Sequence, residues 1–339
     1  MKWRKNIKLN LLIIIITVLS FTALLSARLI SADEQLSPQP EATESQTAAS
    51  TQSETVSNNG SVGSSMRTTA SAASAFSAET VDISAPYACL YNATTDEILY
   101  EKSIDEKIHP ASLTKILTAI TALDYTDSDT IITVGTELEL LPEHSSLCLI
   151  KKGHRLTLYD LLTGMLVSSG NDAAYTVAVN VVRQVMDRDD ISNKDAVSYF
   201  TDMMNFTARF IGCTSSSFTT PDGFDDEEQY TTVRDLVKIC DYALGIKEIG
   251  DITSTEKKKV VFESGENITW SNSNQLLHKE SPYYYPDAVG MKTGTTPLAG
   301  KCLAAVAHIS SQTYIAVVAG CRSEDERYSS VREMFESVD

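Results

Sequence analysis

The segment His109-Pro110-Ala111-Ser112-Leu113-Thr114-Lys115 places a serine and a lysine three residues apart. Apolar residues after it recur at helical spacing, so we expect a helix over 112–123. On a helix, positions i and i+3 share a face, which puts the Lys115 amine beside the Ser112 hydroxyl. A hydroxyl becomes a good nucleophile only when a base takes its proton. The pair therefore predicts Ser112 as a nucleophile and Lys115 as its base.

Lys115 should be buried, because it lies one turn into an otherwise apolar helix. Burial disfavours an ammonium, so the pKa of Lys115 should fall towards neutrality. We expect like-charge repulsion from Lys292 to lower it further. The simpler alternative is that Ser112 is only an N-cap serine, a common residue at a helix start.

A second motif, Ser169-Gly170-Asn171, lies on a loop between two expected helices. The Ser169 hydroxyl could relay a proton to a leaving group. The Asn171 amide offers both a donor and an acceptor, which suits binding a peptide group. Taken alone, the tripeptide is an ordinary turn sequence.

A third motif, Lys292-Thr293-Gly294-Thr295, predicts an edge strand that receives an extended peptide. Gly294 leaves room for close backbone approach, and Lys292 with the threonine hydroxyls would attract a carboxylate. The alternative is a strand with an exposed lysine. In this order, the three motifs are typical of penicillin-recognising serine enzymes.

The periodicities predict strands at both ends of the folded part and helices between them, an α+β arrangement. One mainly antiparallel sheet would be built from both termini, with a helical subdomain inserted in the middle. The expected elements are two strands within 85–100, helices over 112–123, 158–166, 172–186, 194–211 and 232–244, strands over 260–270, 290–292, 302–309 and 314–319, and a helix over 329–337.

The first 80 residues differ from the rest. Residues 1–28 contain a basic head and an uncharged apolar run from Leu9 to Ala27, roughly 28 Å long as a helix. This layout indicates a signal or membrane-anchor segment, and we favour an uncleaved anchor. Residues 29–80 are rich in Ser and Thr and predict a disordered linker. Residues 81–339 would form the catalytic domain, at the extracytoplasmic face of the membrane, or secreted if the signal is cleaved.

Composition excludes some partners and cofactors. The net charge of −17 argues against nucleic-acid binding. The six cysteines lack zinc-site spacing, and no other metal or cofactor motif is present, so neither metal nor cofactor is expected. Cys302 and Cys321 would face each other in a hairpin, but buried free thiols are favoured over a disulfide. The acidic run 222–228 is expected to be a solvated loop.

Residues 81–339 resemble the serine D-alanyl-D-alanine carboxypeptidases, the low-molecular-mass penicillin-binding proteins. The matching segments are 110–115, 166–174, 290–296 with Ala299-Gly300, and the connecting stretch 218–224. The resemblance implies a β-lactamase/transpeptidase-like fold. It also implies acylation of Ser112 by the penultimate D-Ala carbonyl of a peptidoglycan stem pentapeptide, release of D-Ala, then hydrolysis. β-Lactam antibiotics would be covalent inhibitors.

The same resemblance assigns the oxyanion hole to the N–H groups of Ser112 and Thr295. It assigns binding of the substrate carboxylate to Arg327, with Arg322 as the competing candidate. The sequence departs from the family pattern at Val289, where an acidic residue is usual. The backbone geometry just before Gly290 is therefore expected to differ slightly from that of the family.

Other functions on the same scaffold are a serine β-lactamase, a transpeptidase or endopeptidase, and a non-catalytic wall-binding protein. A β-lactamase resembling class A would need a glutamate to activate the deacylating water. No glutamate occurs between Asn171 and Glu227. This favours a peptidase that penicillin inhibits.

Overall fold

The computed structural model describes residues 83–339. The expected anchor segment, 1–28, and linker, 29–80, lie outside the described residues. Within the described part, no helix has both the length and the apolar character needed to cross a membrane.

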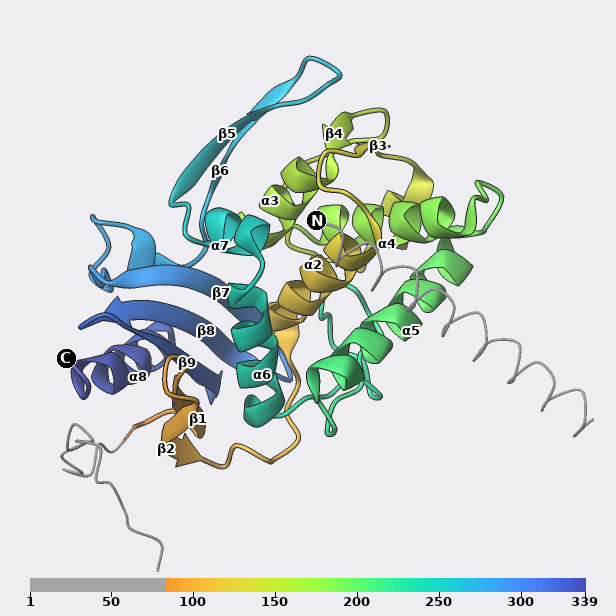
Figure 1. Ribbon diagram of the computed structural model, residues 1–339. Helices are drawn as coiled ribbons and strands as arrows, with labels where there is room; N and C mark the ends of the chain where they lie inside the picture. Colours follow the sequence, from red (N-terminus) through yellow and green to blue (C-terminus); the bar gives the residue numbers. More distant parts are fainter. Residues whose placement is uncertain (1–82) are drawn as a thin grey trace, which may run out of the picture. The chain divides into compact units, whose positions relative to one another are not determined.

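A five-stranded antiparallel sheet of order β2-β1-β9-β8-β7 is built from both ends of the described chain (Figure 1). Its strands are β1 (Tyr87–Asn92), β2 (Glu97–Lys102), β7 (Ala288–Thr296), β8 (Gly300–Ile309) and β9 (Gln312–Cys321). β7 lies at one edge, as predicted for the strand that carries Lys292-Thr293-Gly294-Thr295. Its pairing with β8 is irregular between Ala288 and Gly290 but continuous from Gly290 to Thr296. The residues of the motif are therefore in register, although Val289 stands where the family has an acidic residue.

The central strands β8 and β9 are buried on both faces of the sheet. Successive side chains of a strand point to opposite sides, so each strand contributes to two cores. On β8, Cys302, Ala304 and Val306 join the core on one face. Leu303 and Ala305 join a second core on the other face, which the helix α8 (Glu324–Glu336) covers. The fold class predicted from the sequence is therefore confirmed: an antiparallel sheet with helices on both faces and a helical part inserted between its strands.

The inserted part follows β2 and returns to the sheet at β7. Its helices are α2 (Thr114–Tyr125), α3 (Leu158–Val167), α4 (Asn171–Met186), α5 (Asn193–Ile211), α6 (Val233–Leu244) and α7 (Lys247–Thr253), with 3₁₀ turns η1 (Ala111–Leu113), η2 (Thr136–Leu140) and η3 (Gln275–Leu277). Two short hairpins, β3 (Ile131–Thr133) with β4 (Arg155–Thr157) and β5 (Lys257–Val261) with β6 (Asn267–Ser271), complete it.

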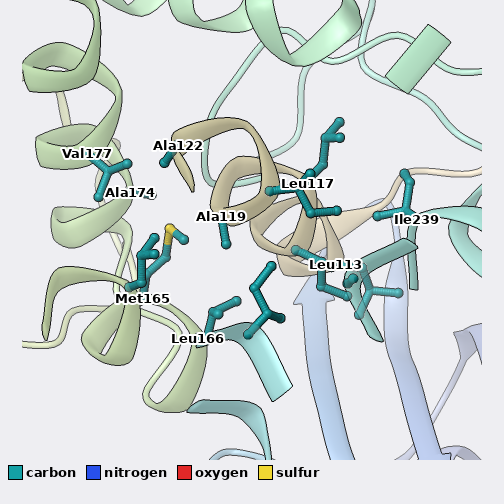
Figure 2. Packing of buried hydrophobic residues seen from close by; sticks show 14 of the residues in the cluster. Leu113, Leu117, Ala119, Ala122, Met165, Leu166, Ala174, Val177 and Ile239 are labelled. Carbon is teal, nitrogen blue, oxygen red and sulfur yellow. The ribbon is translucent and has the colours of Figure 1, made fainter. Parts of the chain in front are cut away.

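Helix α2 lies at the centre of this part, and every residue from Thr114 to Ala122 is buried. Its apolar side chains pack against α3, α4 and α6: Figure 2 shows Ala119 on the side of Met165 and Ala174, and Leu117 on the side of Ile239. A helix that is buried all round needs a largely apolar sequence. Lys115, in its first turn, is therefore a charged residue inside the core.

Two of the predicted elements need correction. The strand expected over 260–270 is a hairpin, because Gly265, with φ +100°, turns the chain after Phe262. The last helix starts at Glu324 rather than 329, because the Ser323 hydroxyl caps it by accepting the N–H of Glu326. Helix α7 and the β3–β4 hairpin were not expected. The six cysteines are buried free thiols, in agreement with the favoured prediction.

Candidate active site

Ser112 lies in the 3₁₀ turn η1, directly before α2. The N-cap positions of η1 and α2 are Pro110 and Leu113, so the N-cap alternative does not describe Ser112. The residue before it, Ala111, has φ +47°, which is left-handed and strained for alanine. A strained backbone beside a half-buried hydroxyl is typical of a functional site.

The Lys115 amine contacts three oxygen atoms. Its Nζ lies 2.9 Å from Ser112 Oγ, 2.8 Å from Asn171 Oδ1 and 2.8 Å from the carbonyl oxygen of Asp222. The amide and carbonyl oxygens can only accept hydrogen bonds, whereas the hydroxyl can also donate. A neutral Lys115 would therefore give its two N–H groups to Asn171 and Asp222 and turn its lone pair to Ser112. The arrangement suits a base that takes the hydroxyl proton.

Burial lowers the pKa of Lys115 to about 8, and the carboxylates of Asp222 and Asp172 act in the opposite direction. The predicted fall is thus present, and burial is its largest cause. The pKa of Lys292 also lies well below its usual range, because of burial and the charges of Lys115 and Arg327.

Ser169 and Asn171 come from the loop between α3 and α4. Ser169 is half-buried with φ +62°, and Asn171 is the first residue of α4. The backbone N–H of Asn171 donates to the carbonyl of Ser146 at 2.8 Å, which fixes the start of α4. The structure therefore brings Asn171 to Lys115 and places Ser169 two residues away on the same loop.

Strand β7 approaches the serine turn closely. A Cβ added to Gly294 would lie 3.1 Å from the backbone nitrogen of Ser112, so the glycine permits the close backbone approach that was predicted. Lys292 is buried, and its Nζ donates to the carbonyl of Thr293 at 2.9 Å. It is therefore a neighbour of Lys115 inside the protein and not the exposed lysine of the alternative interpretation. The Thr293 hydroxyl contacts Ser273 Oγ at 2.6 Å.

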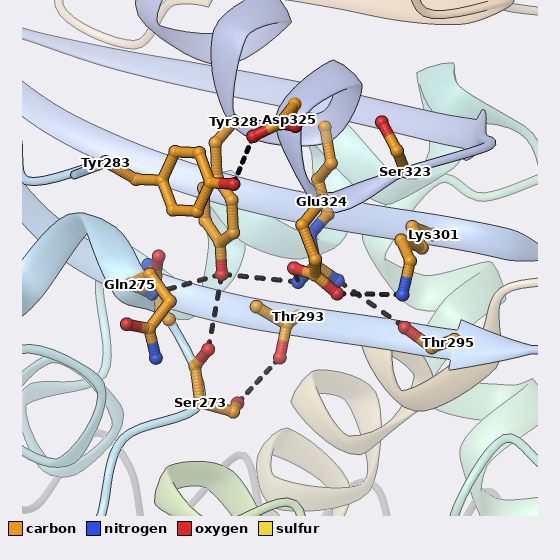
Figure 3. Close-up of polar contacts among 12 residues, drawn as sticks. Ser273, Gln275, Tyr283, Thr293, Thr295, Lys301, Ser323, Glu324, Asp325 and Tyr328 are labelled. Atoms are coloured by element: carbon orange, nitrogen blue, oxygen red, sulfur yellow. Dashed lines mark hydrogen bonds and ion pairs between the residues drawn. The ribbon is translucent and has the colours of Figure 1, made fainter. Parts of the chain in front are cut away.

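Arg327, on the first turn of α8, reaches the same strand. Its Nη1 lies 3.4 Å from the carbonyl oxygen of Gly294 and 3.5 Å from Thr295 Oγ1. Figure 3 shows Thr293 and Thr295 on β7, with Tyr328 of α8 above the strand. Arg322 is exposed just before the helix. The geometry thus favours Arg327 over Arg322 as the arginine of the cleft.

The family model described as D-alanyl-D-alanine carboxypeptidase matches residues 72–323. The chain belongs to this family. The D-alanyl-D-alanine carboxypeptidase DacF of Bacillus subtilis is 28% identical over 252 residues, covering 74% of this chain and 60% of that protein. DacC of Escherichia coli is 30% identical over 253 residues, covering 71% and 57%. The chain therefore spans about three fifths of the length of these two relatives.

Solved structures support the same assignment. The crystal structure of the Streptomyces K15 DD-transpeptidase superposes with a TM-score of 0.68 at 28% identity, covering 75% of this chain and 97% of that one. The D-alanyl-D-alanine carboxypeptidase DacD from Francisella tularensis gives a TM-score of 0.65 at 25% identity. The fold of the described residues is thus that of DD-peptidases.

The connection 221–225 contributes contacts that sequence reasoning missed. Asp222, predicted to lie in a solvated loop, is buried and accepts from Lys115 through its backbone carbonyl. Asp225 accepts from the Thr296 hydroxyl at 2.6 Å and from the Leu298 N–H at 3.0 Å, which ties this connection to the end of β7. A backbone acceptor has no signature in a sequence; the only signal was the resemblance of 218–224 to the family's connecting segment.

The described residues contain no group of three or more His, Cys, Asp or Glu side chains that could hold a metal ion. The chemistry assembled around Ser112 consists of a hydroxyl, an amine of lowered pKa, an amide and a guanidinium. These groups suit acyl transfer through a serine ester.

Proposed function

We propose that this protein is a serine D-alanyl-D-alanine carboxypeptidase that removes the terminal D-Ala from peptidoglycan stem pentapeptides. The observation that carries the proposal is the contact of Lys115 Nζ with Ser112 Oγ, Asn171 Oδ1 and the carbonyl of Asp222. A buried amine with two fixed acceptors and one hydroxyl is poised to take the hydroxyl proton. Membership of the DD-carboxypeptidase family supports the choice of substrate.

In the proposed reaction, neutral Lys115 accepts the Ser112 proton as Oγ attacks the penultimate D-Ala carbonyl. The oxyanion is stabilised by the backbone N–H groups of Ser112 and Thr295, which the close approach of Gly294 to η1 brings near each other. The C–N bond then breaks, and the D-Ala amine leaves with a proton relayed through Ser169. Water hydrolyses the ester and regenerates Ser112.

Substrate binding is proposed to use β7 and its neighbours. The peptide would lie along the edge strand 292–295 as an added strand, with Asn171 holding an amide group. Its terminal carboxylate would be bound by Arg327 and the hydroxyls of Thr293 and Thr295. The buried Lys292 would support this strand through its hydrogen bond to the Thr293 carbonyl. β-Lactams would acylate Ser112 in the same position.

The test is labelling with a fluorescent penicillin. We expect a covalent adduct in the wild-type protein, loss of it in Ser112→Ala, and retention in Ser146→Ala, which removes a hydroxyl from the loop next to Asn171. An adduct that survives in Ser112→Ala would overturn the assignment of the nucleophile. Absence of any adduct in folded wild-type protein would overturn the proposal.

Product analysis then separates the enzyme classes. A carboxypeptidase releases D-Ala from a pentapeptide without turning over the penicillin. Rapid penicillin hydrolysis would instead indicate a β-lactamase. The solved K15 relative is named a DD-transpeptidase, so an added amine acceptor is included. Predominant transfer to that amine would make this protein a transpeptidase.

We also propose that residues 1–28 anchor the enzyme at the extracytoplasmic face of the membrane, with residues 29–80 as a tether. The support is the basic head before an apolar run of membrane-spanning length. Mass spectrometry of the exported protein's N-terminus, with membrane fractionation, tests this. An intact N-terminus in the membrane fraction is expected; a soluble protein starting near Arg28 would show a cleaved signal instead.

A further inference from the structure

Glu324, one turn before Arg327 on α8, places its carboxylate on the Arg327 guanidinium. One carboxylate oxygen accepts from Arg327 Nη2, and the other accepts from Lys301 Nζ at 2.8 Å. Figure 3 shows Glu324 and Lys301 beside Thr295 on β7. An internal carboxylate is thus bound by the arginine that lies next to the Thr295 hydroxyl.

The partners in this cluster differ in burial. The side chain of Arg327 is 5% exposed, that of Glu324 44% and that of Lys301 27%. Arg327 is fixed by the Tyr328 ring, 4.7 Å from its guanidinium carbon, and by the carbonyls of Gly294 and Cys302. Because a half-exposed carboxylate can be hydrated when it turns away, Glu324 is the member of the pair that can move.

The pairing has an electrostatic reason. A buried guanidinium without a counterion is unfavourable, so Glu324 stabilises Arg327 in the unliganded protein. A carboxylate that enters the cleft supplies the same negative charge. The two carboxylates cannot occupy Nη2 together, since they would repel each other there. Lys301 stays close to Glu324 and can keep it paired after it leaves Arg327.

We propose that Glu324 competes with the terminal carboxylate of the ligand for Arg327, and so determines how strongly the cleft prefers carboxylate-bearing ligands. The inference rests on the proposed function, because it takes Arg327 as the carboxylate-binding group. Glu324 is a specificity-determining residue in this scheme: it does not touch the reacting atoms.

An acidic residue in the first turn of a helix is also stabilised by the helix dipole, whatever it contacts. Asp325 shares that interaction and carries the same charge, but it accepts from the exposed Tyr283 hydroxyl and not from Arg327. Asp325→Asn is therefore a matched control for helix stability and for the general loss of one negative charge.

The experiment compares acylation of the full-length protein by benzylpenicillin and by its methyl ester, which lacks the carboxylate charge. In Glu324→Gln, the second-order acylation constant for benzylpenicillin should rise about fivefold, the effect of removing one partly exposed ion pair. The constant for the ester should change by less than about twofold. Asp325→Asn should leave both nearly unchanged. Glu324→Asp, which keeps the charge on a shorter side chain, should lie between wild type and Glu324→Gln.

Each result decides the matter. A selective gain for benzylpenicillin in Glu324→Gln, or in Glu324→Asp if the first variant is unfolded, supports competition. An unchanged or lower constant, an equal gain for the ester, or the same gain in Asp325→Asn overturns it while the proposed function stands. If the wild-type protein is acylated by neither compound, the proposed function fails and the role of Glu324 fails with it.

Discussion

The amine nitrogen of Lys115, a fully buried side chain, and the hydroxyl oxygen of Ser112 lie 2.9 Å apart. Ser112 and Lys115 are only three residues apart, but their chemistry depends on Asn171 and Asp222 from two other segments. The Asn171 Oδ1 and Asp222 carbonyl oxygens can only accept hydrogen bonds from Lys115, so they determine where the lone pair of a neutral lysine points. Burial of α2 lowers the pKa of Lys115, which makes the neutral amine accessible near neutral pH.

Acylation should depend on pH through Lys115. Its pKa of about 8 means that only about one tenth of the protein has the free amine at pH 7. The acylation constant for a penicillin should therefore rise with pH, with a midpoint near 8, since the base must be deprotonated. Stopped-flow or intact-mass kinetics between pH 6 and 10 measure this. Lys115→Arg should show no acylation at any of these values, because arginine keeps its proton. A flat profile would exclude Lys115 as the base.

Asp222→Asn should move that midpoint to lower pH. The Asp222 carboxylate favours the charged form of Lys115, so removing it lowers the lysine pKa further and increases the neutral fraction at pH 7. The backbone carbonyl that accepts from Lys115 remains. Asp226→Asn, in the exposed part of the same loop, serves as the control and should leave the midpoint unchanged. A midpoint that rises in Asp222→Asn would contradict the assignment.

Asn171→Asp should move the midpoint in the opposite direction. Asn171 Oδ1 lies 2.8 Å from Lys115 Nζ, and a carboxylate at this position would stabilise the ammonium. The profile should shift to higher pH, and acylation at pH 7 should fall. The shift of the midpoint separates this electrostatic effect from the loss of the amide group, which lowers the rate at every pH. An unshifted midpoint would mean that the base is another group.

Much of this site could be predicted from the sequence because its motifs are local. The helix-face pair Ser112 and Lys115, the loop with Asn171 and the close approach of Gly294 each follow from short segments. The partners of Lys115 could not be predicted in full, since the carbonyl of Asp222 is a backbone group 107 positions away.

The burial of charged residues could not be predicted from the sequence either. The two motifs that contain a lysine suggested that Lys292 would lower the pKa of Lys115, but burial is the largest cause of that fall, and the pKa of the buried Lys292 itself lies well below its usual range. The acidic run after Pro221 was expected in solvent, although Asp222 is needed inside because the chain must pass against Ala111. Composition does not reveal which member of a charged run is buried. The pairing of Glu324 with Arg327 was missed for a related reason: the helix start at Ser323 was not recognised, so the two residues were not placed one turn apart.

Gly223 packs directly against the backbone of Ala111, the residue before Ser112. Gly223 has φ +83°, and a Cβ added there would lie 1.9 Å from the Ala111 carbonyl oxygen, whereas Gly212 has φ +94° and no atom within 4 Å of its added Cβ. Both alanine variants bear the strain of a left-handed backbone, about 1 kcal/mol, but only Gly223→Ala must also displace the serine turn. We expect Gly223→Ala to lower the free energy of unfolding by about 3 kcal/mol or more and to abolish acylation, because Ser112 follows Ala111. Gly212→Ala should lose about 1 kcal/mol and acylate normally. Denaturant unfolding and penicillin labelling of both variants provide the comparison, and equal losses in the two would show that the approach of Gly223 to Ala111 does not position the nucleophile.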